Sequence, residues 1–244
     1  MKAQRVRPFQ QCRNVLCIGF LVLVICLLLL FSNFLGSVVE RWKQEAQSIC
    51  TNSPKWYTET SCDFDCHVGE TRLKQRLKLL ADISSALNKT QGLHWLCYGT
   101  LWGVLRGSTL LEYDRDGDIC TISISQEELV DIITHLPGTI KYTQNYTSYH
   151  IWRDLAEVEI TSFVYSSIRN DNTDEYMIIR EGYSNLLVSR SCKPEAFPER
   201  FIKPPLSRKL LDGVYFPVPR DSYEIQMYIY PEDWYYTATP VCCQ

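Results

Sequence analysis

Three aspartates at alternate positions are the residues whose spacing points most directly to chemistry. Asp114, Asp116 and Asp118 lead into a strand-like run, Ile119 to Ile124. Alternate side chains of an extended backbone point to the same face, so the three carboxylates are expected to converge. Like charges repel each other unless a cation lies among them, and hard oxygen ligands of this kind bind Mg²⁺ or Mn²⁺. The triplet predicts a divalent metal site, with a solvated Asp-rich turn as the alternative.

A phosphate-binding element is predicted just before the aspartates. Gly99 and Thr100 follow a short apolar run, Leu93 to Tyr98, and open a segment that is expected to become helical. Backbone N–H groups and a hydroxyl at such a turn can approach a phosphate, and Arg106 follows one or two helical turns later as a charged clamp. A phosphate site and an acidic metal site would then be adjacent.

The elements that must position these residues can be read from periodicity. Apolar residues at helical spacing over Glu70 to Leu87 predict an amphipathic helix that packs on a sheet as scaffold. Strands over 93–98 and 119–124 would place Cys97 and Cys120 in or near the core. Further expected elements are a helix from Gln126 to about Leu136 behind a capping box at Ser125, strands over 139–143, 149–152, 156–165 and 176–179, a hairpin turn at Asp212-Gly213, and a helix beginning near Pro219.

Two other features of the sequence concern the surroundings of the site. Along residues 156–165, alternation puts Glu157 and Glu159 on one face and the apolar residues between them on the other. Residues 192–205 are rich in proline and basic residues, so an irregular loop or lid is expected there, with a plain soluble loop as the alternative. The four histidines, His67, His94, His135 and His150, lack ligand spacing and are assigned no catalytic role.

These motifs resemble the LicD/fukutin family of phosphocholine and phosphopentitol transferases. The family signature joins a Gly-Thr/Ser-Leu-Leu-Gly-x-x-Arg element to an Asp-x-Asp-x-Asp element, which match residues 99–106 and 114–118. Val158-Glu159-Ile160 looks like the family's Val-Asp-Ile strand, which carries a further acid. Its closing Val-Pro-x-Pro and Tyr-Gly-x-x-Trp-like blocks look like Phe216 to Pro219 and Tyr228 to Trp234.

The resemblance covers roughly residues 70–236 and implies a fold and an activity. The fold would be α+β, with a nucleotidyltransferase-like mixed sheet flanked by helices. The activity would be metal-dependent transfer of a phospho-alcohol, of the ribitol phosphate or phosphocholine type, from a CDP-activated alcohol donor to a hydroxyl of a glycan or glycoprotein acceptor. The resemblance implies four ligands of Mg²⁺ or Mn²⁺: Asp114, Asp116, Asp118 and Glu159. Asp116, Asp118 and Glu159 would also be the catalytic acids. The implied donor-binding residues are Gly99, Thr100 and Arg106.

The sequence departs from the family pattern at three places. Glu112-Tyr113 stands where Pro-Trp is usual, Glu159 replaces Asp, and Tyr230-Pro231 replaces the late Tyr-Gly. Glutamate keeps a pair of metal-binding oxygens but carries them on an arm one methylene longer. Two other functions therefore stay open: a catalytically degenerate family member that binds glycans or acts as a scaffold, and a Golgi glycosyltransferase with an Asp-x-Asp metal site on a different fold.

An apolar run near the N-terminus predicts a membrane anchor. Residues 15–31 carry no charge, and Phe34-Leu35 extend the run to about the thickness of a bilayer. Basic residues precede it and the nearest cleavage-site candidate is poor, which favours an uncleaved signal anchor with a cytosolic N-terminus. The expected organisation is a cytosolic tail 1–14, a transmembrane signal anchor 15–35, a lumenal stem 36–69 and a LicD-like domain 70–244, in a single-pass type II protein of the Golgi or endoplasmic reticulum membrane.

Cysteine use, sequons and charge agree with a lumenal domain. Eight of the 11 cysteines follow the anchor, an even number that suits disulfides in an oxidising compartment, but the sequence does not fix their pairing. Asn88 and Asn145 open Asn-x-Thr sequons and are predicted N-glycosylation sites. Four of the 25 basic residues precede residue 36, which leaves 21 basic against 28 acidic residues, so no nucleic acid partner is expected.

Overall fold

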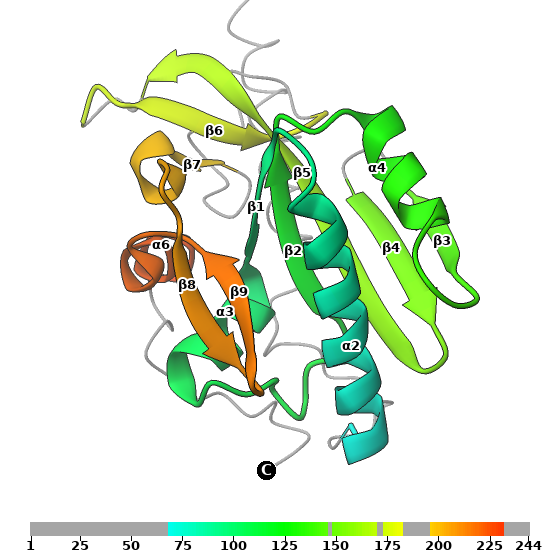
Figure 1. Ribbon diagram of the computed structural model, residues 1–244. Coiled ribbons are helices and arrows are strands. Elements are labelled where there is room, and N and C mark those ends of the chain that lie inside the picture. Colours follow the sequence, from blue (N-terminus) through cyan, green and yellow to red (C-terminus); the bar gives the residue numbers. More distant parts are fainter. Residues whose placement is uncertain (1–67, 146–147, 170–172, 183–195, 232–244) are drawn as a thin grey trace, which may run out of the picture. The chain divides into compact units, whose positions relative to one another are not determined.

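The computed structural model describes residues 68–145, 148–169, 173–182 and 196–231 of the 244-residue chain (Figure 1). The predicted tail 1–14, anchor 15–35 and all but the last two residues of the stem lie outside the described residues, and the boundaries between them stay predictions. Within the described ranges, no helix is long and apolar enough to cross a membrane.

The described strands form one seven-stranded mixed sheet and a separate two-stranded hairpin. The main path of the sheet runs β1-β2-β5-β4-β3, and β6 pairs with both β5 and β7. The strands are β1 Leu93–Leu96, β2 Gly117–Ile122, β3 Lys141–Gln144, β4 Ser148–Arg153, β5 Ala156–Arg169, β6 Tyr176–Arg180, β7 Ala196–Pro198, β8 Ser207–Leu211 and β9 Val214–Val218. The structure confirms the predicted α+β class with a mixed sheet.

Strand β5 is the centre of the sheet. It runs parallel to β2 and antiparallel to β4 and β6. The β2–β5 register sets Asp118 opposite Glu159, and the β4–β5 register sets His150 opposite the same glutamate. Asp118 and Glu159 therefore meet across adjacent strands although they are distant in the sequence.

One face of the sheet is covered by two helices that contact each other, α2 (Glu70–Leu87) over β2 and β5 and α4 (Gln126–Thr134) nearer β4 and β3 (Figure 1). The bounds of α2 are those expected from its periodicity, and Ser125 caps α4 by accepting a hydrogen bond from the Glu128 N–H at 3.1 Å. Gly117 permits the close packing of α2 on β2, because a Cβ there would lie 2.9 Å from both terminal carbons of Leu80. The α2 face is thus an apolar core.

The opposite face carries α3 (Tyr98–Arg106), a short 3₁₀ helix η2 (Glu199–Ile202) and α6 (Ser222–Ile229), whereas the β8–β9 hairpin contacts β1 and α2. Asp118 points to this face, since its carboxylate contacts Thr100 of α3. Three aromatic rings, Trp95, Phe163 and Phe197, pack there with centroids 5.1 to 6.3 Å apart. This face therefore combines a packed aromatic core with the acids of the site.

Two expectations about local structure are wrong in the described residues. The strand expected over 93–98 ends at Leu96, because Cys97 is the N-cap of α3 and Tyr98 adopts a φ of 43°. The described part of the loop expected over 192–205 contains β7 and η2, and its apolar side chains, such as Phe201, are buried. A segment rich in proline and basic residues is here part of the core, because its interspersed Phe and Ile residues pack inward.

Candidate metal and phosphate site

Three acids meet at the edge where β2 and β5 begin. Asp116, Asp118 and Glu159 each offer a carboxylate oxygen, and these oxygens lie within 4.8 Å of one another. Asp118 is buried, whereas Asp116 and Glu159 are half-buried. The parallel β2–β5 register brings Glu159 to the aspartates. We call Asp116, Asp118 and Glu159 the acid triad.

Asp114 lies beside the acid triad rather than within the set of converging oxygens. Its side chain is 6% exposed, and its Oδ1 accepts a hydrogen bond from the Arg115 N–H at 3.1 Å. Its side chain is hydrogen-bonded to that of Asp116. The structure thus keeps all four predicted acids together, and a ligand role for Asp114 stays a prediction.

The first turn of α3 packs directly against the carboxylates. The Thr100 N–H donates to Oδ2 of Asp118 at 3.1 Å, and the Thr100 hydroxyl lies 3.3 Å from the same oxygen while accepting from the Asp118 N–H at 2.7 Å. At Gly99, a Cβ would collide with Oδ2 of Asp114 and lie 3.4 Å from Oδ2 of Asp118. These two residues hold the acids in place, with the positive end of a helix dipole behind them. A phosphate contact from either residue stays a prediction.

A buried arginine supports the aspartate loop from the other side. Arg76 of α2 is fully buried; its Nη1 donates to the carbonyl of Asp114 at 2.8 Å, and its Nη2 donates to the carbonyl of Arg115. Burial lowers the pKa of Arg76, and the neighbouring aspartates act against that shift. Arginines of an amphipathic helix are expected on its polar face, and Arg76 departs from this expectation. Its spacing from Leu73 and Leu80 puts it on the apolar stripe, and that was the available signal.

The outer edge of the acid triad is bounded by ion pairs. Arg180 of β6 donates from Nη2 to Oε1 of Glu159 at 3.3 Å. His150 of β4 places Nε2 3.9 Å from the same oxygen and Nδ1 3.4 Å from Oε1 of Glu157. Neither basic residue was singled out from the sequence, because only the register of β4, β5 and β6 brings them to Glu159.

Burial and mutual repulsion raise the pKa of all three aspartates. Burial, with the nearby Asp116 charge, raises the pKa of Asp114 to about 8. Burial and then the charges of Asp116 and Asp114 hold the pKa of Asp118 well above its usual range. For Asp116, burial and then Glu157 and Glu159 raise the pKa. A cluster with this cost of ionisation is suited to a divalent cation, which favours the charged carboxylates.

A disulfide joins the two motif segments. Cys97, the N-cap of α3, is bonded to Cys120 of β2, with 23 residues of sequence separation. The bonded cysteines flank the Gly-Thr element on one side and the aspartates on the other. Both were expected in or near the core, and their pairing was not predictable.

Arg106 ends α3 two turns after Gly99, on the same side of the helix. Its guanidinium stacks 4.1 Å above the ring of Trp102, which also lies 6.2 Å from the ring of Tyr230. Arg106 is hydrogen-bonded to Tyr113, the neighbour of Asp114. This places Arg106 in the vicinity of the acids, as expected, and its contact with phosphate stays a prediction.

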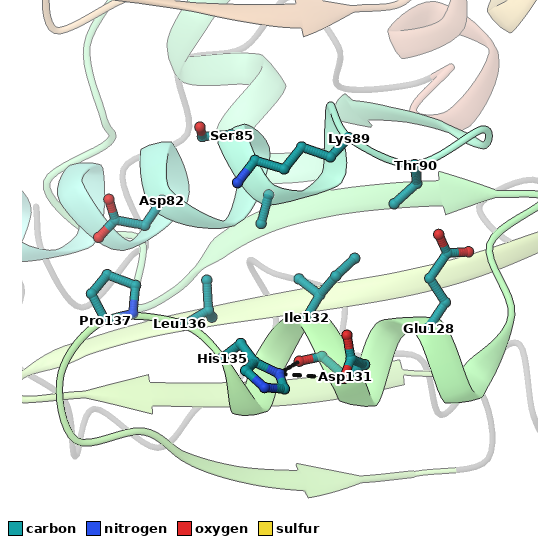
Figure 2. Close-up of a pocket in the computed structure, with 11 residues that line it drawn as sticks. Asp82, Ser85, Lys89, Thr90, Glu128, Asp131, Ile132, His135, Leu136 and Pro137 are labelled. Atoms are coloured by element: carbon teal, nitrogen blue, oxygen red, sulfur yellow. Dashed lines mark hydrogen bonds and ion pairs between the residues drawn. The ribbon is translucent and has the colours of Figure 1, made fainter.

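A separate polar cleft lies between α2 and α4 and has a volume of about 490 Å³. Figure 2 shows Asp82 and Lys89 on one wall and Asp131 and His135 on the other. In the cleft, His135 and Asp131 are paired with each other. None of its lining residues belongs to the acid triad, so the cleft is not part of the predicted site.

Comparison with known proteins gives one family match. The family described as LicD/FKTN/FKRP, nucleotidyltransferase domain, matches residues 93–221, a range that contains the Gly-Thr element, the aspartates and Glu159. No curated protein matches the chain.

Three solved structures are distantly similar. ANT(2")-Ia in complex with adenylyl-2"-tobramycin has 14% identity and a TM-score of 0.41, and the match covers 64% of this chain and 72% of that one. The lincosamide antibiotic adenylyltransferase LnuA, lincomycin-bound, has 16% identity and a TM-score of 0.40, with coverage of 67% and 87%. The 3'-deoxy ATP bound form of Vibrio cholerae DncV has 11% identity and a TM-score of 0.24, with coverage of 59% and 44%.

Proposed function

Since this chain belongs to the LicD/FKTN/FKRP nucleotidyltransferase-domain family, we propose that it is a metal-dependent transferase that moves a phospho-alcohol from a CDP-activated donor to a glycan hydroxyl. The transferred group is of the ribitol phosphate or phosphocholine type. The acceptor oxygen forms a bond to the phosphorus that carries the alcohol, the bond from that phosphorus to the bridging oxygen breaks, and CMP leaves. The hydroxyl proton passes to a carboxylate of the site or to solvent.

The observation that carries this proposal is the convergence of the acid triad. Three carboxylate oxygens within 4.8 Å of one another form a donor set that fits Mg²⁺ or Mn²⁺. Asp116, Asp118 and Glu159 would hold the ion, with Asp114 as a neighbour. A divalent ion bound there supplies positive charge to the diphosphate oxygens and to the leaving nucleotide.

The chain's own residues fix and complement this cluster. Thr100 and Arg76 hold Asp118 and the aspartate loop through four hydrogen bonds that do not involve a ligand. Such support keeps the carboxylates in position before a ligand arrives, so little reorganisation is needed when it binds. Arg106 would clamp a phosphate, and a carboxylate not engaged with the ion would accept the acceptor's proton.

The test is a transferase assay on the full-length chain with CDP-ribitol and CDP-choline, a glycan acceptor and Mn²⁺, measuring release of CMP. The double variant Asp116→Asn plus Asp118→Asn should lose activity by about 1,000-fold or more, because both changes remove ligand charge. Asp131→Asn, on the exposed cleft wall of α4, is the matched control and should keep full activity. An unchanged rate in the double variant would remove the metal-site assignment.

A second candidate function is a degenerate family member that binds glycans or acts as a scaffold. Glu159 already has basic partners in Arg180 and His150, so its charge is partly offset without an ion. Calorimetry that finds no binding of Mn²⁺ or CDP to the folded chain would favour this function. The family assignment argues against the remaining alternative, a glycosyltransferase built on a different fold.

We also propose that residues 15–35 anchor the chain in the Golgi or endoplasmic reticulum membrane, with the domain in the lumen. The Cys97–Cys120 disulfide suits an oxidising compartment, and both sequon asparagines, Asn88 and Asn145, are exposed. Expression in mammalian cells should give a product whose electrophoretic mobility increases after endoglycosidase treatment. Asn88→Gln plus Asn145→Gln should remove that shift, and an untreated wild-type chain of unglycosylated mass would contradict the lumenal placement.

A further inference from the structure

We propose that Arg180, which lies outside the sequence motifs, binds the diphosphate of a nucleoside diphosphate ligand at the outer edge of the acid triad. This inference rests on the proposed function of the site. Arg180 is the last residue of β6, and its Cα is paired with that of Phe163 on β5. Its guanidinium extends back along β5 to Glu159, where Nη2 lies 3.3 Å from Oε1.

The position of Arg180 differs from that of the other arginine beside the acids. Arg76 is fully buried and donates to two main-chain carbonyls, so it cannot reach a ligand without unfolding the loop. The side chain of Arg180 is 16% exposed and contacts an acid that is 22% exposed. It is thus enclosed enough for a strong interaction and open enough for a ligand to approach.

The charges of the cluster indicate what Arg180 binds. The carboxylates of Asp114, Asp116, Asp118 and Glu159, with Glu157 beside them, outnumber the guanidinium groups of Arg76 and Arg180, and a divalent ion would offset the excess negative charge. When that ion takes Glu159 as a ligand, the ion and the guanidinium share one carboxylate and repel each other. An anion that touches both relieves this repulsion. A diphosphate has enough oxygens to bind the ion and to offer a second pair of oxygens to a guanidinium. A guanidinium binds such a pair through two parallel hydrogen bonds.

The alternative is that Arg180 only orients Glu159, and the two roles predict opposite effects on metal binding. If Arg180 binds the diphosphate, replacing it removes a positive charge next to a metal ligand, so Mn²⁺ alone binds equally well or more tightly. If Arg180 positions Glu159, replacing it weakens Mn²⁺ and nucleotide together. The sign of the Mn²⁺ effect therefore separates them.

The experiment is calorimetry on the full-length chain, first with Mn²⁺ and then with CDP at saturating Mn²⁺. Arg180→Gln should weaken CDP by about 10- to 100-fold, the value of one or two charge-assisted hydrogen bonds, and leave the affinity for Mn²⁺ unchanged or increased. Arg180→Lys keeps the charge and should recover part of the loss. Arg169→Gln, an exposed β5 arginine paired with Asp174, is the matched control and should bind both ligands like the wild type.

Two results would overturn the assignment of Arg180: CDP affinity in Arg180→Gln within twofold of the wild type, or losses of Mn²⁺ and CDP affinity of the same size. Thermal unfolding of each variant shows that the chain is folded. A wild type that binds neither ligand would overturn the proposed function as well. A wild type that binds both, shows the expected Arg180→Gln effect and transfers nothing would keep the diphosphate site and remove the transferase activity.

Discussion

The two sides of the acid cluster are held by different kinds of interaction. On the inner side, Asp114 and Asp118 are 6% and 4% exposed, and hydrogen bonds from Thr100 and Arg76 fix Asp118 and the loop that carries Asp114. On the outer side, the half-buried Glu159 is held by an ion pair with Arg180, and Nε2 of His150 lies 3.9 Å from it. The inner side is therefore part of the folded core, and the outer side is an ionic edge.

The difference indicates how a site can be rigid and still accept ligands. Hydrogen bonds to buried carboxylates and carbonyls are costly to break, because any group left unpaired loses its solvation as well. Ion pairs at a partly exposed edge exchange partners more readily than buried hydrogen bonds do, because water and ligands can reach them. We infer that the inner side fixes the geometry of the metal site, while the outer side exchanges its contacts with the ligand.

The largest effect is expected when the inner support is removed. Arg76→Met leaves the carbonyls of Asp114 and Arg115 without their donor and removes the buried charge that offsets the aspartates. The free energy of unfolding should fall by about 3 kcal/mol or more, as for other broken buried charge interactions. Urea denaturation measures it. Lys78→Met removes an exposed cation of α2 and is the control, with an expected loss below about 1 kcal/mol. Equal losses in the two variants would contradict the inner–outer distinction.

A second inner-side change tests the close packing of α3. In Gly99→Ala, the added methyl group collides with Asp114 and presses on Asp118. Overpacking of this kind costs about 1 to 3 kcal/mol, so the affinity for Mn²⁺ should fall by up to about 100-fold. Gly69→Ala is the matched control, because nothing lies within 4 Å of its Cβ. Equal Mn²⁺ affinities in the two variants would show that α3 does not define the site.

The stability of the metal-free chain should depend on pH through the inner side. The folded-state pKa of Asp114 is about 8, above its usual 3.8, so the folded chain holds a proton that the unfolded chain has lost. Stability from such a group is present at low pH and is lost as pH rises through the folded-state pKa. Between pH 6.5 and 8 the free energy of unfolding in EDTA should fall by about 2 kcal/mol.

Two controls sharpen this pH prediction. Asp114→Asn removes one of the titrating groups and should reduce the slope, and saturating Mn²⁺ should restore stability at pH 8. Between about pH 4 and 6.5 His94 contributes in the opposite sense and offsets part of the aspartate slope. Burial and the charge of Arg208 lower the pKa of His94 to about 4, so in this range the unfolded chain binds the extra proton. A flat curve for the metal-free wild type between pH 6.5 and 8 would contradict the raised aspartate pKa values.

The smallest effect is expected at the outer edge, from His150→Gln. The side chain of His150 is 27% exposed and its Nε2 lies 3.9 Å from Glu159, so its contribution is that of a partly screened pair. Affinity for Mn²⁺ should change by less than about threefold and the free energy of unfolding by less than about 0.5 kcal/mol. His135→Gln, in the cleft on α4, provides the baseline. A loss as large as that of Gly99→Ala would move His150 to the inner side.

The sequence predicted those features that depend on neighbouring residues. The bounds of α2 follow from local periodicity, and the start of α4 follows from the capping box at Ser125. The spacing of the aspartates was enough to predict an acid cluster. Glu159 was identified as its fourth member only through the resemblance to the family, because the contact depends on the register of β2 with β5.

What the sequence did not predict depends on pairings between distant segments. Eight cysteines allow many disulfide patterns, and only the antiparallel pairing of β1 with β2 brings Cys97 to Cys120. Arg180 reaches Glu159 through the β5–β6 register. Arg76 is an exception, because its place on the apolar stripe of α2 could be read from the local sequence. A charged residue at a buried helix position indicates that it binds polar groups in the interior.

The central claim is that the acids of β2 and β5 form a single divalent metal site. The most direct test is a Mn²⁺ titration of the full-length chain, with binding monitored by electron paramagnetic resonance. The account predicts one tightly bound Mn²⁺ per chain, and a loss of affinity of about 100-fold or more in the isosteric variant Asp118→Asn, which keeps the shape of the side chain but not its charge. A wild type that binds no Mn²⁺, or an Asp118→Asn variant that binds it as tightly as the wild type, would contradict it.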